Sequence, residues 1–159
     1  MAGKKDIAWV ADQVNTTLKA YLTAKFLVLD TEYADGITLT PIPTAHYFIA
    51  EQVRPVYPLV MVIPDGTDPG DESNDSNYEL ERHSLTVAIG LTANAGEDAL
   101  KRRVVRALRA IMEVLEAYPT LGDTVVHTVC GRREYGALFL GERSIGQEAQ
   151  MRLLVTTMP

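Results

Sequence analysis

Residues 83–119 read HSLTVAIGLTANAGEDALKRRVVRALRAIMEVLEAYP. The first nine of these residues alternate between large apolar and smaller side chains, which predicts a strand with one buried face. Turn-forming residues at 94–96 end the strand. Glu97 and Asp98 then favour the start of a helix, because acidic side chains stabilise its positive end. The helix is predicted to run to Tyr118, since Pro119 cannot continue it.

The predicted helix has two contrasting faces. Its large aliphatic residues fall within about one quarter of the helix circumference and form one apolar stripe. These residues are Leu100, Val104, Leu108, Ile111 and Leu115. The opposite face carries Arg102, Arg106, Arg109, Glu113 and Glu116. One interpretation of this face is a solvated surface with internal ion pairs. The other is a subunit interface through its three arginines, because arginine tolerates partial desolvation and pairs with carboxylates.

The remaining segments complete an α+β pattern. Apolar residues at spacings of three and four predict another helix over residues 6–26, and the continuous apolar run 59–63 predicts a strand covered on both faces. Further β-type patterns lie at 26–29, 37–40, 46–53, 125–130 and 147–157. Consecutive strands favour antiparallel pairing, and two one-faced helices can cover one side of a sheet. The predicted fold is a single α+β domain, residues 1–159, with a mainly antiparallel β-sheet and two principal helices packed on one face.

The opposite face of the predicted sheet has a mixed composition. Its expected members are Thr86, Ala88, Thr128, Cys130, Arg152 and Leu154. Such a face suits either solvent or another subunit.

The negative charge of the chain is concentrated in residues 65–82, DGTDPGDESNDSNYELER. Seven acids and one base give this stretch a net charge of −6, which equals that of the whole chain. Its polar and turn-forming residues predict a flexible loop at the tip of a hairpin. The order of a calcium-binding loop is missing, so a solvated loop is favoured over a metal site. The acids expected to meet the arginine face of an adjacent subunit are Asp65, Asp68, Asp71, Glu72 and Asp75.

The composition sets outer limits on function. A pI near 5.0 argues against a surface built to bind nucleic acid. No apolar run approaches the roughly 20 residues needed to cross a membrane, and the amino terminus lacks a secretory signal pattern. The single cysteine, Cys130, fits a reducing compartment. We therefore expect a protein of cytosolic origin.

No pattern of residues predicts catalysis, and no phosphate-binding glycine motif is present. His127 and Cys130 are three positions apart, so on a strand they point to opposite faces and cannot hold one metal ion. His83 is in phase with Leu85 and is interpreted as a packing residue. We expect no enzymatic activity, no cofactor and no metal. A small hydrolase that uses Cys130 or a histidine is the alternative.

Several segments together resemble the tail terminator, or tail completion, proteins of long-tailed bacteriophages. They are a leading helix, AHYFIAEQV at 45–53, PVYPLVMVIPDG at 55–66, the acidic loop, HSLTVAIGL at 83–91, the arginine-rich helix EDALKRRVVRALRAIMEVLEAYP at 97–119 and a closing hairpin. The resemblance is one of layout and texture over about residues 6–157, without an invariant motif. It implies an α+β fold with an antiparallel sheet flanked by helices, in agreement with the fold predicted from the residues.

The resemblance also implies a structural virion protein that forms a ring, expected to be hexameric, on the end of the tail tube. The ring would end tube growth and provide the joining surface to the head connector. Its implied partners are other copies of itself, the tail tube protein and a head–tail connector or neck protein. DNA would pass through its lumen without specific binding, and no membrane would take part. The implied location is the neck end of the tail in the virion, with assembly in the host cytoplasm. A head-closure or neck protein is the alternative.

Overall fold

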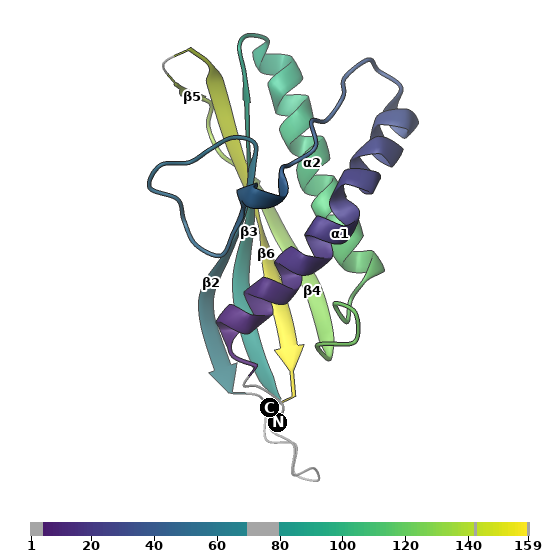
Figure 1. Cartoon of the computed structure of the whole chain (residues 1–159), viewed down its shortest axis with the longest axis vertical. Coiled ribbons are helices and arrows are strands. Elements are labelled where there is room, and N and C mark those ends of the chain that lie inside the picture. The colour runs from purple at the N-terminus through teal and green to yellow at the C-terminus, as the bar shows by residue number, and fades with distance from the viewer. Residues whose placement is uncertain (1–4, 70–79, 142, 159) are drawn as a thin grey trace.

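The computed structural model describes residues 5–69, 80–141 and 143–158 (Figure 1). Helix α1 spans Ile7–Tyr33 and begins at Asp6, whose carboxylate accepts a hydrogen bond of 2.9 Å from the amide of Trp9. The helix ends at Ala34, which adopts the left-handed conformation. The prediction of a helix end near residue 26 and a strand at 26–29 is wrong. The spacing of buried residues continues through Phe26 and Leu29, so this segment packs as helix despite its β-type composition.

The sheet is almost entirely antiparallel. A short 3-10 helix, Thr44–His46, leads into the strands β1 (Tyr47–Phe48), β2 (Leu59–Pro69), β3 (Glu81–Ala93), β4 (His127–Tyr135), β5 (Phe139–Leu140) and β6 (Ile145–Thr157). Their order across the sheet is β1-β2-β3-β6-β4, and β5 also pairs with β6. The pair β1–β2 is parallel, while all other pairs are antiparallel. The two longest strands, β3 and β6, therefore form the centre of the sheet.

Helix α2 spans Glu97–Ala117 and lies beside α1 on the same side of the sheet (Figure 1). All five residues of its predicted apolar stripe are fully buried. They pack with the buried residues of α1 and with alternate residues of β2, β3 and β6 in one main core. The predicted α+β fold, with two helices on one face of a mainly antiparallel sheet, is confirmed. Within the described residues, neither helix is long and apolar enough to span a bilayer.

The sheet face opposite the helices, called the outer face here, is covered at one end. Leu59, Met61 and Ala88 form a second buried cluster there, and Phe48 and Tyr57 pack against it. The ring of Tyr57 lies over Gly90, so that an added Cβ at Gly90 would come within 2.6 Å of the ring. The start of β2 is therefore buried on both faces, as the apolar run predicted.

Two expected members of the outer face lie on the helix side instead. Register pairs Thr128 and Cys130 of β4 with Val155 and Leu153, which belong to the main core. Directly opposed residues of neighbouring strands share a face, so Thr128 and Cys130 face the helices. Val129 of β4 faces outward instead, and it is exposed. The alternation of residues in β4 was predicted correctly, but its two sets of residues were assigned to the wrong faces of the sheet. The assignment depends on the strand that pairs with β4, which the sequence does not reveal.

The predicted acidic loop is partly strand. β2 continues to Pro69 and β3 begins at Glu81, so residues 65–69 and 81–82 extend the hairpin. Pairing with β3 supplies backbone hydrogen bonds that local turn propensity does not anticipate. The register shifts between Pro64 and Gly66, which places Asp65 in a bulge. Residues 70–79, with Asp71, Glu72 and Asp75, lie outside the described residues.

Candidate assembly surfaces

Arg106 of α2 is buried rather than exposed. Its side chain is 3% exposed and donates from Nη1 to Asp30 Oδ1 at 3.2 Å and to the carbonyl of Ile37 at 2.7 Å. Its Nη2 forms an ion pair with Asp35. The guanidinium also lies over the ring of Tyr33, 4.2 Å from its centroid. Arg106 thus joins α2 to the end of α1 and to the loop that follows it.

The carboxylates around Arg106 are also fixed by backbone amides. Asp30 accepts from the amide of Leu39 at 2.9 Å, and Asp35 accepts from the amide of Ile37 at 3.1 Å. Burial raises the pKa of Asp35, but the amide of Ile37 and the charge of Arg106 outweigh it and lower this pKa overall. The carboxylate of Asp35 is therefore held in the charged form that pairs with Arg106.

The other two arginines of the predicted interface remain at the surface. Arg109 donates to the hydroxyl of Tyr33 at 3.0 Å and lies 3.8 Å from Glu113, four residues further along the helix, which is one of the ion pairs expected within this face. Arg102 is exposed and lines a depression of about 240 Å³ with Tyr33 and Lys101. A contact between this face and an acidic neighbour stays a prediction for Arg102 and Arg109, whereas the guanidinium of Arg106 is engaged within its own chain.

Two of the predicted interface acids, Asp65 and Asp68, lie in a strand at the edge of the sheet. Asp65 accepts a hydrogen bond of 2.6 Å from the hydroxyl of Thr86, and Asp68 is exposed. Both are in β2, on the far side of the sheet order from β4. Whether these acids contact another subunit stays a prediction.

His83 is fully buried at the end of the hairpin, in agreement with its interpretation as a packing residue. Its Nδ1 lies 2.9 Å from the hydroxyl of Thr67 and its Nε2 lies 3.0 Å from that of Thr157. Burial lowers the pKa of His83, although Glu81 and Asp6 act in the opposite direction. The neutral imidazole therefore links β2, β3 and β6 through two threonine hydroxyls.

Cys130 and His127 do not form a common site. The sulfur of Cys130 lies 4.0 Å from the carbonyl of Met112 in α2, while His127 is exposed at the start of β4. Burial raises the pKa of Cys130 to about 11, so little thiolate forms near neutral pH. Across the described part of the chain, no group of three His, Cys, Asp or Glu residues is arranged to hold a metal ion.

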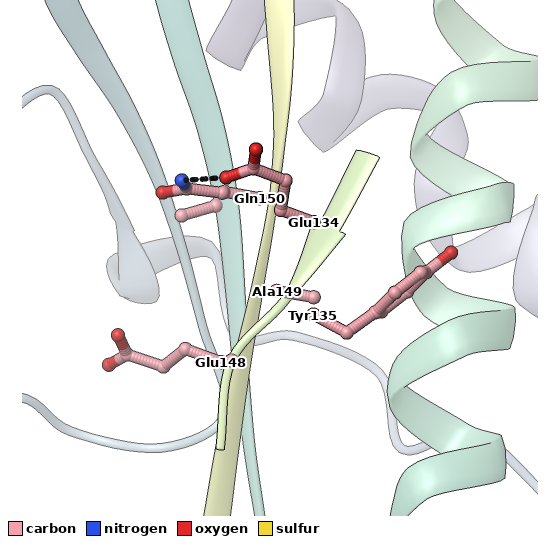
Figure 2. A pocket seen from close by; sticks show the side chains of 7 residues that line it. Glu134, Tyr135, Glu148, Ala149 and Gln150 are labelled. Carbon is pink, nitrogen blue, oxygen red and sulfur yellow. Dashed lines mark hydrogen bonds between the residues drawn. The ribbon is translucent and has the colours of Figure 1, made fainter. Parts of the chain in front are cut away.

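A depression of about 270 Å³ lies where β4 meets β6 (Figure 2). Tyr135 points towards α2, whereas Glu148 and Gln150 point away from the helices. The two carboxylates that line the depression are hydrogen-bonded, Glu134 to Gln150 at 3.2 Å and Glu148 to the hydroxyl of Tyr57 at 3.0 Å. These bonds engage both carboxylates with neighbouring side chains. We therefore interpret the depression as part of the outer surface and not as a catalytic site.

Sequence reasoning missed several exposed apolar residues in two short segments. Val53 is 97% exposed and Leu140 is 87% exposed, with Leu138 and Val56 about half exposed. Two short segments carry them, the loop before β2 and the hairpin that contains β5. The signal in the sequence was the run of apolar residues at 137–140 between glycines, which was not separated from the closing hairpin as a whole.

Comparisons with known proteins give little further guidance. No family model matches this sequence, and no curated protein shows a significant match to it. Among solved structures, a chain of the "Virion of native gene transfer agent (GTA) particle" is similar over 96% of this chain and 99% of that chain. The identity is 13% and the TM-score is 0.36. A TM-score of this size carries no argument about fold or function.

Proposed function

We propose that this chain is a structural virion protein that forms a ring on the end of a phage tail tube, where it ends tube growth and joins the tail to the head connector. The observation that carries the proposal is the order of elements from the leading helix to the closing hairpin, the layout that resembles the tail terminators. The α+β sandwich of sheet and helices is the fold that this resemblance implies.

The surface of the chain supports a role in assembly. The acidic edge of β2, the arginines of α2 and the exposed apolar tips near Val53 and Leu140 lie on different elements. A subunit that meets two neighbours, a tube and a connector needs several distinct contact surfaces. The role requires no catalytic residue and no cofactor. An acidic hairpin towards the lumen would also keep passing DNA from binding, since like charges repel.

Light scattering coupled to size exclusion tests the proposal, with the protein alone and with purified tail tube protein. We expect a ring-sized species, or a complex with tube ends, in at least one of the two samples. A strict monomer that neither self-associates nor binds tube ends contradicts the proposal. Binding to a portal or adaptor protein in place of the tube would indicate the head-closure station instead.

A further inference from the structure

The sheet has two long unpaired edges. β1 covers β2 only at Val60 and Met61, so the outer side of β2 is open over residues 62–69. β4 ends the sheet order on the other side. Within residues 5–69, 80–141 and 143–158, no strand pairs with either of these edges. Unpaired edges expose backbone donors and acceptors that readily accept another strand.

The two open edges lie at the same height in the sheet. In the strand register, Asp68 of β2 is opposite Arg82 of β3, which is opposite Thr156 of β6. Thr156 is in turn opposite His127 of β4. In the same way, the level of Gly66 is that of Val129, through Ser84 and Leu154. The open part of β2 and residues 127–133 of β4 therefore span matching levels. A neighbouring copy needs no shift along the strands to bring one edge against the other.

The strand directions also suit a head-to-tail contact. Three successive antiparallel pairs separate β2 from β4, so the two edge strands run in opposite directions. A second copy in the same orientation would thus place its β2 antiparallel to β4 of the first. This arrangement continues the hydrogen-bonding pattern that the sheet already has.

Charge distinguishes this contact from a two-fold one. The β2 edge carries the exposed acids Asp65 and Asp68, with Asp65 in a bulge. β4 has its own irregularity between Cys130 and Arg133, where the side chain of Arg132 is 81% exposed and lies 3.4 Å from Glu134 of the same strand. Pairing β2 with β2 would oppose acids, and pairing β4 with β4 would oppose arginines. Pairing β2 with β4 brings Asp65 and Arg132 to neighbouring levels.

We infer that residues 62–69 of β2 in one copy pair antiparallel with residues 127–133 of β4 in the next copy, so that the sheet continues from subunit to subunit. This inference specifies the contact between subunits of the proposed ring, and the closure of that ring rests on the proposed function. A head-to-tail contact repeats without limit unless rotation closes it, and a closed ring leaves no open edge. The opposite charges of the two edges favour this pairing over a contact between like edges.

Cysteine cross-linking between copies tests the pairing. In a Cys130→Ala background, Asp68→Cys and His127→Cys are combined in one chain, and mild oxidation is followed by non-reducing electrophoresis. Within one chain the two positions are three strand spacings apart, about 14 Å, which is too far for a disulfide. Between paired copies, opposed Cβ atoms lie about 5 Å apart, close enough to cross-link. We expect a ladder of dimers, trimers and higher species.

Three controls fix the meaning of the ladder. Each single-cysteine variant alone forms a cross-link only if two β2 edges or two β4 edges meet. The product is then a dimer, because each chain has only one cysteine. A chain with Asp68→Cys and Val53→Cys has two exposed thiols but only one at an edge, and it should give no ladder. Gly66→Cys with Val129→Cys repeats the test at another level, and an added Cβ at Gly66 meets no atom within 4 Å.

The outcomes separate this inference from the proposed function. Rings that form with tube protein, but without a ladder from either cysteine pair, overturn the edge pairing and leave the proposed function standing. A ladder from both pairs without any binding to tube ends supports the pairing and contradicts the proposed function. Dimers from the Asp68→Cys or His127→Cys variant alone show a two-fold contact and also overturn the inference.

Discussion

Replacing Arg106 by methionine should destabilise the fold strongly. The substitution keeps the length of the side chain but removes two ion pairs and the hydrogen bond to the carbonyl of Ile37. Removing one partner of a buried ion pair costs about 3–5 kcal/mol. The side chains of Asp30 and Asp35 remain 12% and 28% exposed and keep their amide donors, which favours the lower end, about 3 kcal/mol. For a chain of this size, that loss lowers Tm by about 6–12 °C.

Thermal and urea unfolding followed by circular dichroism measure this loss. The matched control is Arg102→Met on the same helix, which removes an exposed arginine and should change the free energy of unfolding by less than about 0.5 kcal/mol. Adding Asp30→Asn and Asp35→Asn to Arg106→Met should recover part of the loss, because no uncompensated carboxylate then remains. If Arg106→Met and Arg102→Met have the same free energy of unfolding, the internal role of Arg106 is refuted.

Three further predictions concern single positions. Gly146→Ala should cost about 1–3 kcal/mol in urea unfolding, because its Cβ would overlap the ring of Phe139; Gly66→Ala, which meets no neighbour, should be nearly neutral. Burial lowers the pKa of His83, so its contribution to stability is complete above about pH 6.5 and is lost as the pH falls towards the lowered value. Unfolding at about pH 7.5 and pH 5.5 should therefore show a smaller pH dependence for His83→Gln, and an unchanged dependence would contradict this. Cys130, with its pKa raised to about 11, should react with a thiol reagent about a hundredfold more slowly in the folded than in the unfolded protein; equal rates would contradict its burial.

The periodicity of the sequence was sufficient for the main fold. The stripe from Leu100 to Leu115 and the alternation around Leu85 identified α2 and β3, because burial on one face imposes periods of 3.6 and 2. The end of α1 was not predictable in the same way. Residues 26–29 have β-type composition, but they are helical and pack in the core through Phe26 and Leu29. Tertiary contacts decide such segments, and a local window does not contain them.

The candidate site was predicted only in part for a related reason. Arg106 falls on the polar side of the helical wheel, which gives no sign that the end of α1 and the loop after it cover this position. Its partners Asp30 and Asp35 lie more than 70 residues earlier in the sequence, a separation that periodicity cannot bridge. The open edges of the sheet were likewise hidden, because strand order depends on which strands pair and not on their composition.

The concentration of acid in the hairpin can now be connected with the open edge of β2. The exposed acids Asp65 and Asp68 lie on that edge, so two β2 edges repel each other, while β4 does not repel β2. Salt should weaken the preference of a β2 edge for a β4 edge, since the Debye length falls to about 3 Å at about 1 M. The ladder from the Asp68→Cys and His127→Cys chain should then decrease. A ladder that salt does not change would mean that backbone geometry, rather than charge, selects the partner edge.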